Sequence, residues 1–507
     1  MLTFTKAAPE QVGIPGFRIR NCLERLNRKG IPMHSFLLLR HNQLITEGYY
    51  APYTAKTLHR MFSISKSFTA IAIGLLADEG KLSLSDPVIQ YFPEKLPQNL
   101  HPWIAEMTIR DMLMMRTCHA ATTYKANVNK DWVESFFTTP PTHPAGKVFH
   151  YDTSSAHTLC ALAEKLTGTE MLHYIKKKLS PLGLSEASYM LKDPFGVSMG
   201  GSGLVATTMD ILKFGYFLYC KGRINGEQLL STSYIEEATS KLTETCITAP
   251  LPSEASGYGY QIWQNEQGGF VCYGMGGQLV IVLPDYDMIC VTTADTQGIG
   301  GGNQQIYDAV YEEILPYIQE EALPVTSQTI CDYEDYIRSL CMMPLKPQSA
   351  APAHGNNTFT LKQISAVNDV FFETAKNAPA SSLPFPQPNP WGYDGFSVRF
   401  ISPTEETNAF SEGILTFSIE ERPYHIHFGL GSLKTGKFPI YNMNYAASGI
   451  WLTDNTLYIK VHIIDSSIGS VHFQLSFGED DLTVFMRKQE ETMFNEFSGH
   501  LYCQKRV

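Results

Sequence analysis

The sequence predicts an α+β domain followed by an all-β domain. Three observations support this prediction: an amphipathic helix pattern that begins near residue 63, two continuous apolar segments around residue 285, and alternating apolar and polar residues after residue 357. Helix patterns beside buried-strand patterns indicate a sheet covered by helices. Short strands at regular spacing indicate a barrel or a sandwich. A chain of 507 residues is long enough for both domains.

The first elements along the chain are a hairpin and a helix. Residues 35–50 contain an apolar segment, a polar turn at residues 40–43 and a second apolar segment, which is typical of a β-hairpin. Residues 63–76 carry apolar side chains at spacings of four, three and four, which predicts an amphipathic helix. Gly80 follows where a helix would end, as expected for a glycine just past the last turn.

A second hairpin and a second helix follow before residue 320. Residues 279–283 and 288–292 are continuous apolar segments separated by a turn that contains Pro284, which predicts two antiparallel strands buried on both faces. Residues 303–317 show apolar side chains four apart and predict a helix that packs one face against the core. An amphipathic helix that includes residues 333–341 is also expected, followed by a linker rich in Pro and Ala at residues 345–356.

The pattern changes to a period of two in the last third of the chain. Residues 457–463, 471–477 and 482–486 each alternate apolar with mostly polar side chains, which predicts strands with one buried face. We therefore expect one domain over residues 1–325, a helix and linker over residues 326–356, and a β domain over residues 357–507.

Composition excludes several function classes. The net charge of −11 repels phosphate backbones and anionic lipids, so we expect no nucleic acid and no membrane as partner. Ten cysteines include no Cys-x-x-Cys pair, and no spacing of His, Asp and Glu suggests a metal site or another cofactor. The first residues lack the pattern of a secretory signal. Together with the scattered thiols, this favours a cytoplasmic location.

The segment Ser63-Ile-Ser-Lys66 holds the most informative residues. A helix places positions three apart on one face, so the serine hydroxyl and the lysine amine lie close together. A serine needs a nearby base to become a nucleophile, and burial can lower the pKa of a lysine enough to serve. The N-terminus of a helix also directs N–H groups at a developing oxyanion. By spacing alone, however, a capping serine and a solvated lysine are the more ordinary interpretation.

Several ordered segments add a family resemblance to this spacing. The segment Met61–Asp86, with four later stretches at residues 108–115, 144–151, 200–210 and 276–284, resembles the serine β-lactamase and penicillin-binding-protein-like family. The likeness is strongest to its class C β-lactamase, esterase and 6-aminohexanoate-oligomer hydrolase branch, and it covers about residues 10–320. The resemblance implies a β-lactamase/transpeptidase-like fold, an antiparallel sheet flanked by helices plus a helical lobe, and makes residues 1–325 a serine hydrolase domain.

The resemblance assigns roles to individual residues. Ser63 matches the acylated nucleophile, and Lys66 matches the residue that accepts or orients its proton. Tyr151 matches the tyrosine that acts as general base for the serine and general acid for the leaving group. A tyrosine can act as a base only if a cation such as Lys66 stabilises its phenolate. Without the family context, a packed aromatic would be the ordinary interpretation of Tyr151.

Two motifs depart from the family pattern. Where the family has Tyr-x-Asn, this chain has Thr153 in place of the asparagine, and threonine lacks the two amide donors. The third family motif begins with a lysine or histidine that attracts a substrate carboxylate, but this chain has the triplet Cys272-Tyr273-Gly274. The missing cation disfavours substrates that carry such an anion.

Further candidates surround the third motif and the pocket. By the resemblance, the N–H of Met275 is the second oxyanion donor after that of Ser63, and Gly274 and Gly276 let the backbone approach a ligand. A tight turn without a catalytic role is the alternative for these glycines. His119 lies where the family chain skirts the pocket, although a packed histidine is the more ordinary interpretation.

These observations predict a metal-independent serine hydrolase that acts on a small amide, peptide or ester without a cofactor. One alternative is a penicillin-recognising module that binds without turnover, and another is a true β-lactamase or D-Ala carboxypeptidase. The β domain is expected to form one wall of the cleft, to mediate a homo-oligomer or to bind an apolar ligand. Its residues do not distinguish among these roles.

Overall fold

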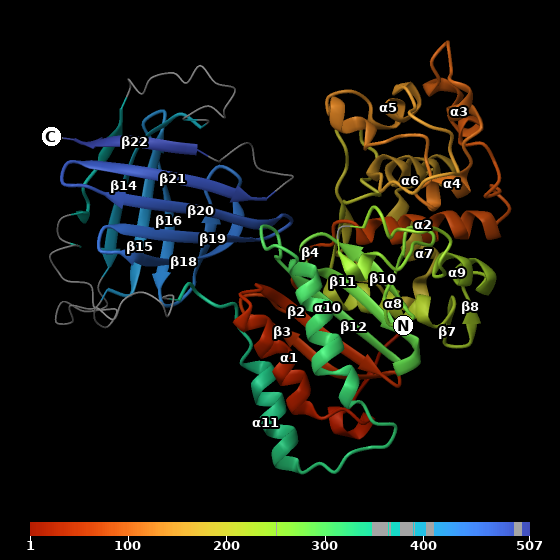
Figure 1. Cartoon of the computed structure of the whole chain (residues 1–507), viewed down its shortest axis with the longest axis horizontal. Helices are drawn as coiled ribbons and strands as arrows, with labels where there is room; N and C mark the ends of the chain where they lie inside the picture. Colours follow the sequence, from red (N-terminus) through yellow and green to blue (C-terminus); the bar gives the residue numbers. More distant parts are fainter. Residues whose placement is uncertain are drawn as a thin grey trace. The chain divides into compact units, whose positions relative to one another are not determined.

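Two compact units make up the chain, Met1–Leu340 and Cys341–Val507 (Figure 1). The computed structural model describes residues 1–249, 251–346, 364, 367–375, 389, 391–401, 410–490 and 499–506. Most of the predicted linker and the first residues of the predicted β domain, residues 347–363, lie outside this set.

A seven-stranded sheet forms the centre of the first unit. Its strands pair antiparallel except for the parallel pair of β1 with β3. Their spatial order is β1 (Thr5–Lys6), β3 (Gln43–Tyr49), β2 (Met33–Arg40), β12 (Met288–Ala294), β11 (Gln278–Leu283), β10 (Phe270–Gly274) and β9 (Trp263–Gln264). Strands β11 and β12 are buried along their whole length, which explains their continuous apolar sequences.

Both predicted hairpins are confirmed. Strands β2 and β3 pair through a turn in which His41 and Asn42 have φ angles of 49° and 59°, as a two-residue hairpin turn requires. Strands β11 and β12 pair through a short 3-10 turn at Pro284–Tyr286. Small two- and three-stranded pairings complete the unit; they are formed by β4 (His59–Arg60), β5 (Tyr189–Met190), β6 (Leu204–Ala206), β7 (Arg223–Ile224) and β8 (Glu227–Gln228).

Some helices of the first unit pack on the sheet and others form a helical lobe. They are α1 (Gly16–Arg28), α2 (Ile64–Asp78), α3 (Pro102–Ala105), α4 (Ile109–Leu113), α5 (Trp132–Thr138), α6 (Thr153–Thr167), α7 (Met171–Lys178), α8 (Thr208–Tyr219), α9 (Thr232–Ala238), α10 (Gly302–Glu313) and α11 (Ser327–Arg338). Helix α8 packs on β11 and β12, and α1 packs on α10, where Arg25 and Glu312 form an ion pair of 2.7 Å. The arrangement agrees with the predicted α+β class.

Three predicted helices can be compared with the structure. Helix α2 confirms the one predicted over residues 63–76. The helix predicted over residues 303–317 is α10, which ends at Glu313 and is followed by a 3-10 turn at Leu315–Tyr317. The helix predicted to include residues 333–341 is α11, but α11 ends at Arg338, so the prediction was wrong for Leu340 and Cys341.

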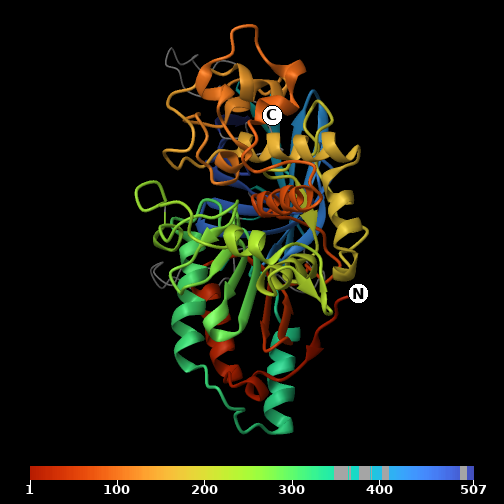
Figure 2. The ribbon, with the colours of Figure 1, turned by 90° about the vertical axis from the view of Figure 1, so that its right-hand side faces the viewer.

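Helix α2 lies between two parts of the first unit. It contacts α6 and α7 of the helical lobe and also β10 of the sheet (Figures 1 and 2). Almost all of its side chains are buried, which is expected for a helix covered from several sides. The start of α2 therefore lies where the helical lobe meets the sheet.

The second unit is a closed antiparallel barrel. Its strands follow the order β16–β15–β14–β13–β22–β21–β20–β19–β18–β17, and a short parallel pairing of β16 with β18 closes the ring. The strands are β13 (Phe372–Thr374), β14 (Tyr393–Ile401), β15 (Glu412–Ile419), β16 (Arg422–Leu430), β17 (Lys434–Phe438), β18 (Met443–Thr453), β19 (Thr456–Ile464), β20 (Ile468–Phe477), β21 (Asp481–Gln489) and β22 (Gly499–Lys505). The alternating apolar residues form its core, so of the two predicted architectures the barrel is the one observed.

The described residues contain neither a helix that could span a membrane nor a cluster that could hold a metal ion. No helix among them combines the length and the apolar character that a membrane span needs. No group of three or more His, Cys, Asp or Glu side chains in these ranges could hold a metal ion.

Replacing Gly74 tests how tightly α2 is held. A Cβ atom at this position would lie 2.4 Å from Cε1 of Tyr234, whose hydroxyl donates to the Ala70 carbonyl at 2.6 Å. We expect Gly74→Ala to lower the free energy of unfolding by about 1–3 kcal/mol, because the new methyl group overlaps the buried Tyr234 ring. Chemical denaturation measures this loss.

A double-mutant cycle gives the control for this prediction. In a Tyr234→Ala background the ring is absent, so Gly74→Ala should lower stability much less. An equal loss in both backgrounds would show that the Tyr234 contact is not the cause.

Candidate active site

Ser63 occupies the N-terminal end of α2, where it is the N-cap residue. The preceding Phe62 has a φ angle of +44°, which is uncommon for a bulky residue. Ser65 stabilises this turn, since its hydroxyl donates to the Phe62 carbonyl at 2.6 Å and accepts from the Leu204 N–H at 2.9 Å. The turn presents Ser63 at the helix end whose partial positive charge favours an anion.

Lys66 lies one helical turn beyond Ser63 and is only 1% exposed. Its Nζ atom is 3.0 Å from Ser63 Oγ and donates to the Gly201 carbonyl at 2.6 Å. Burial lowers the pKa of Lys66 to about 7, although the negative charge of Asp152 opposes this shift. Burial thus moves the pKa of the amine in the direction that a base for Ser63 requires.

Tyr151 completes the group around Ser63. The Lys66 Nζ atom lies 4.8 Å from the centroid of its ring, and the ring stacks on Trp263 at 5.7 Å between centroids. Burial raises the pKa of Tyr151 above its usual value, and hydrogen bonding with Ser63 opposes this rise. The structure thus brings Ser63, Lys66 and Tyr151 together; their roles in catalysis stay predictions.

The two residues after Tyr151 begin helix α6. The Asp152 side chain caps this helix by accepting the Ser154 N–H at 2.8 Å. Thr153 is half-buried, and a Cβ atom built on Gly201 would lie 2.4 Å from its methyl group. Thr153 therefore packs directly against the loop whose carbonyl accepts the hydrogen bond from Lys66.

The third-motif residues lie beside the start of α2. A Cβ atom at Gly274 would lie 2.4 Å from the Met61 carbonyl oxygen, so the end of β10 passes close to Ser63. Met275 and Gly276 form the turn into β11, and Gly276 has a φ angle of +82°. The Gln278 side chain donates to the Met275 carbonyl at 2.7 Å. The oxyanion role of Met275 stays a prediction.

His119 is buried against the helical lobe. Its Nε2 atom lies 2.9 Å from the Phe136 carbonyl oxygen, and the two rings meet edge to face. Burial lowers the pKa of His119 to about 4, so the ring is neutral at neutral pH and Nε2 donates to this carbonyl. These contacts hold the histidine in the packing of the lobe, and its predicted contact with substrate stays a prediction.

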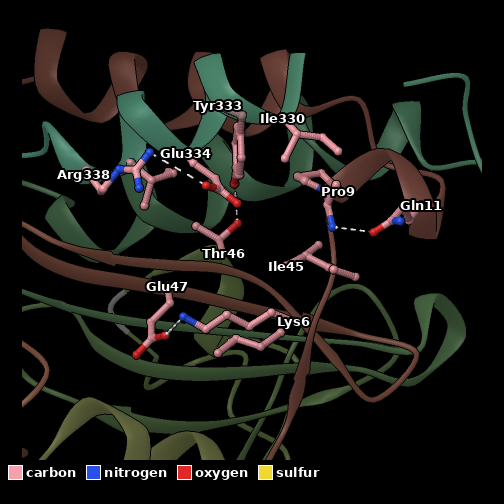
Figure 3. A pocket seen from close by; sticks show the side chains of 14 residues that line it. Lys6, Pro9, Gln11, Ile45, Thr46, Glu47, Ile330, Tyr333, Glu334 and Arg338 are labelled. Carbon is pink, nitrogen blue, oxygen red and sulfur yellow. Dashed lines mark hydrogen bonds and ion pairs between the residues drawn. The ribbon is translucent and has the colours of Figure 1, made fainter. Parts of the chain in front are cut away.

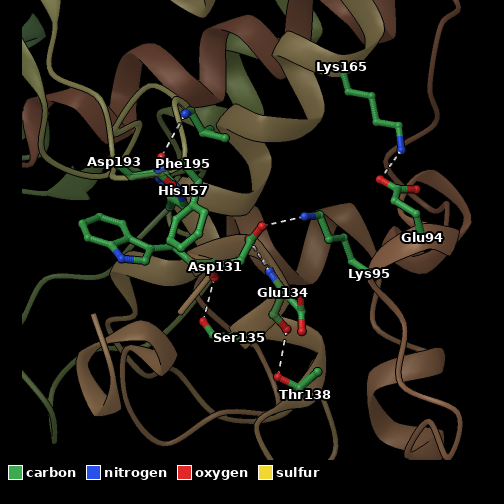
Figure 4. A network of polar contacts seen from close by, with 12 residues as sticks. Glu94, Lys95, Asp131, Glu134, Ser135, Thr138, His157, Lys165, Asp193 and Phe195 are labelled. Carbon is green, nitrogen blue, oxygen red and sulfur yellow. Dashed lines mark hydrogen bonds and ion pairs between the residues drawn. The ribbon is translucent and has the colours of Figure 1, made fainter. Parts of the chain in front are cut away.

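A buried hydrogen bond fixes the segment that leads to Gly201. His157 Nε2 lies 3.0 Å from Asp193 Oδ2, and Asp193 Oδ1 accepts the N–H groups of Phe195 and Val197, each at 2.9 Å (Figure 4). Both side chains of the His157–Asp193 pair are almost fully buried. Because helix α6 carries both Thr153 and His157, it holds this segment at two points.

A separate hollow of about 450 Å³ lies between β3 and α11 (Figure 3). The hydroxyls of Thr46 and Tyr333 meet there at 2.6 Å, and Lys6 pairs with Glu47 at 2.7 Å. Its lining includes none of the residues predicted to bind or transform substrate. This hollow is therefore distinct from the Ser63 site.

Glu254 is a buried carboxyl that no sequence pattern singled out. This residue is 2% exposed, and burial raises the pKa of its carboxyl to about 7, while an interaction with Tyr273 opposes the rise. A glutamate in a Pro- and Ser-containing segment gives no signal of burial, so only the folded chain reveals it.

Known proteins resemble this chain in sequence and in structure. A model of the family described as Beta-lactamase matches residues 19–310. The 6-aminohexanoate-dimer hydrolase of Paenarthrobacter ureafaciens is 22% identical over 281 residues, which are 51% of this chain and 71% of that protein. A solved structure of a candidate 6-aminohexanoate-dimer hydrolase from Bacillus anthracis has a TM-score of 0.50 at 24% identity and covers 62% of this chain and 88% of that one. The structural likeness shows a shared fold.

The close approach of Gly201 to Thr153 gives a prediction. We expect Gly201→Ala to lower kcat for ester hydrolysis by at least about tenfold, because the new methyl group displaces the carbonyl that accepts from Lys66. Steady-state kinetics with p-nitrophenyl butyrate measures this effect.

Gly300→Ala is the matched control, since a Cβ atom there meets nothing within 4 Å. It should keep the kinetic constants of the unaltered chain. Unchanged kinetics for Gly201→Ala would mean that the Gly201 carbonyl does not position Lys66 for catalysis.

Proposed function

Because the chain belongs to the beta-lactamase family, we propose that it is a serine hydrolase that forms an acyl-enzyme with a small amide, peptide or ester. The observation that carries this proposal is the buried amine of Lys66, 3.0 Å from the Ser63 hydroxyl. The sequence relative named 6-aminohexanoate-dimer hydrolase supports an amide as the bond that is cleaved.

Acylation begins when Ser63 Oγ attacks the carbonyl carbon and its proton passes to Lys66 Nζ. The N–H groups of Ser63 and Met275 donate to the oxyanion that forms. Tyr151 then gives its proton to the leaving nitrogen or oxygen and takes one from Lys66, so the old bond breaks and a serine ester remains. Water attacks this ester, the acid is released, and Ser63 regains its proton.

The pKa shifts support Lys66 as the base and Tyr151 as the acid. Burial lowers the pKa of Lys66 to about 7, which makes its amine available as a base. The same burial raises the pKa of Tyr151, which disfavours a phenolate and keeps a proton available for the leaving group. The sequence-based hypothesis gave Tyr151 both roles; these shifts support the acid role.

The third motif bears on the substrate class. The triplet Cys272-Tyr273-Gly274 offers no cation to a substrate carboxylate. We therefore favour amides or esters without that anion over β-lactams and peptides that end in D-Ala.

Replacing Ser63 tests the nucleophile. We expect Ser63→Ala to abolish labelling by a fluorescent phosphonate and to reduce hydrolysis of p-nitrophenyl butyrate by at least about 1000-fold. Ser85→Ala, which changes an exposed serine, should be labelled like the unaltered chain.

Two other results would change the proposal. Unchanged labelling of Ser63→Ala would remove Ser63 as the nucleophile. Lasting label without turnover of any ester, D-aminoacyl amide, cephalosporin or D-Ala-D-Ala peptide would favour the alternative, a penicillin-recognising module that binds without turnover.

The pKa of Lys66 predicts the pH profile. We expect kcat/KM for p-nitrophenyl butyrate to rise with pH around a midpoint near about 7, because Lys66 is protonated below its pKa and accepts a proton only above it. Rates measured from about pH 5 to about pH 9 give this midpoint.

Lys66→Arg serves as the control, since arginine stays protonated throughout this range. It should reduce kcat/KM by at least about 100-fold at every pH. A flat profile for the unaltered chain, or one that falls through neutral pH, would exclude Lys66 as the base.

A further inference from the structure

A glycine-rich turn carries the carbonyl that accepts a hydrogen bond from Lys66. Residues 199–203, three of which are glycines, form this turn, and the N–H groups of its last two residues donate to the Met199 carbonyl at 2.9 and 2.7 Å. Glycine has more backbone freedom than any other residue, so the turn by itself leaves the direction of the Gly201 carbonyl open. Contacts from outside the turn must therefore set this direction.

Two side chains of helix α2 bind successive carbonyls of the turn. The Thr69 hydroxyl donates to the Gly200 carbonyl at 2.9 Å, and the Lys66 amine donates to the Gly201 carbonyl at 2.6 Å. The Thr69 hydroxyl also lies 3.2 Å from the Ser65 carbonyl, the usual acceptor for a threonine inside a helix. Because Thr69 and Lys66 are three residues apart, they project from one face of α2 towards the turn.

The far end of the turn is held in the same way. The Arg60 Nε atom, from strand β4, donates to the Ser202 carbonyl at 3.2 Å. The Ser65 hydroxyl accepts the Leu204 N–H at 2.9 Å just beyond the turn. The carbonyls before and after that of Gly201 are therefore both bound to side chains of α2 or of the strand that precedes it.

Helix α6 packs against the opposite side of the turn. A Cβ atom at Gly200 would lie 2.2 Å from Cβ of Cys160, and one at Gly201 would lie 2.4 Å from the methyl group of Thr153. Both side chains belong to α6. Packing on α6 thus places the backbone of the turn, while hydrogen bonds from the α2 side set where its carbonyls point.

The direction of the Gly201 carbonyl matters for the base. A neutral amine has two N–H bonds and one lone pair. When one N–H of Lys66 is donated to the Gly201 carbonyl, rotation of the amine is restricted and its lone pair can face Ser63 Oγ, which is 3.0 Å from Nζ. Proton transfer depends on this alignment of base and hydroxyl.

We propose that Thr69 is a positioning residue for Lys66: its hydroxyl holds the Gly200 carbonyl on α2 and so directs the next carbonyl, that of Gly201, at the Lys66 amine. Arg60 secures the other side through the Ser202 carbonyl. This inference rests on the proposed function, because it concerns the base of the same reaction. Thr69 acts through the turn and takes no part in bond breaking.

Several charged or ionisable groups surround the amine. Burial is the main cause of the lowered pKa of Lys66; the charge of Asp152 at the start of α6 opposes it, and that of Lys125 in η4 (Thr123–Ala126) adds to it. The Tyr151 ring centroid lies 4.8 Å from Nζ, and Arg60 binds the neighbouring part of the turn. Each of these groups stays in the chain when Thr69 is replaced.

Replacing Thr69 therefore isolates the effect of the turn. Threonine carries no charge, so its loss changes the pKa of Lys66 only through the geometry around the amine. The Gly201 carbonyl accepts a hydrogen bond from the ammonium form and favours it. A carbonyl that turns away withdraws this support, so the pKa of Lys66 should fall further.

The rate at which a fluorescent phosphonate labels Ser63 in the full chain tests the inference, because labelling needs an activated serine and no turnover. Rates are measured from about pH 5 to about pH 9. We expect Thr69→Val, which keeps the branched shape and removes the hydroxyl, to lower the maximal labelling rate at least about tenfold. The phosphonate concentration for half-maximal rate should change less than about twofold. The midpoint of the pH profile should move down by at least about 0.5 in pH, because Lys66 loses an acceptor for its ammonium group.

Two variants serve as controls. Thr69→Ser restores a hydroxyl and should recover most of the rate and the original midpoint. Thr158→Val removes another buried threonine hydroxyl, on α6, that has no hydrogen-bond partner within the described residues, and this variant should be labelled like the unaltered chain. If thermal unfolding shows that Thr69→Val does not fold, Thr69→Ala provides the same test.

Three results would overturn the inference: an unchanged rate and midpoint in Thr69→Val, a lower rate with an unmoved midpoint, or no recovery in Thr69→Ser. The second result would mean that Thr69 supports the fold without acting on Lys66. All three leave the proposed function intact, since that is tested by Ser63→Ala and by the profile of the unaltered chain. An unaltered chain that is not labelled, or whose labelling does not vary with pH, would overturn both.

Discussion

Burial of the Lys66 amine is the constraint on which the site depends. Removing an ammonium group from water is strongly unfavourable, so the folded chain shifts the pKa of Lys66 towards 7. The amine remains in place because the Gly201 carbonyl accepts a hydrogen bond from it and Ser63 lies beside it. An exposed lysine at the same spacing would stay protonated and could not take the serine proton.

The fold supplies this burial through the position of α2. The helix is covered by the helical lobe on one side and by β10 on the other. Gly274 lets β10 approach the Met61 carbonyl more closely than any side chain would permit, and Phe62 takes an unusual backbone conformation between that contact and Ser63. Close packing of sheet and helix therefore sets both the geometry of the nucleophile and the electrostatics of its base.

Two buried carboxyls act on the ionisable side chains of the site. Asp152 is fully buried and its charge acts on Lys66, while Glu254 lies on the side formed by Tyr273 and Trp263. Burial raises the pKa of both carboxyls. Asp152 has hydrogen bonds from Ser154, whereas Glu254 Oε1 has none within the described residues. The first carboxyl is accounted for by the cap of α6.

Local sequence patterns determined most of the secondary structure of this protein. Packing between distant segments decided the geometry and the burial of its site. The hairpins, α2 and the alternating strands could be predicted, because apolar periodicity depends only on neighbouring residues. The Ser63–Lys66 spacing was visible for the same reason, and the family resemblance added Tyr151. The role of Gly201 could not be predicted, since it lies 135 residues from Lys66. The burial of Glu254 and the closure of the barrel by β16 and β18 could not be predicted either. Burial, and every pKa that follows from it, depends on groups that only the tertiary structure brings together.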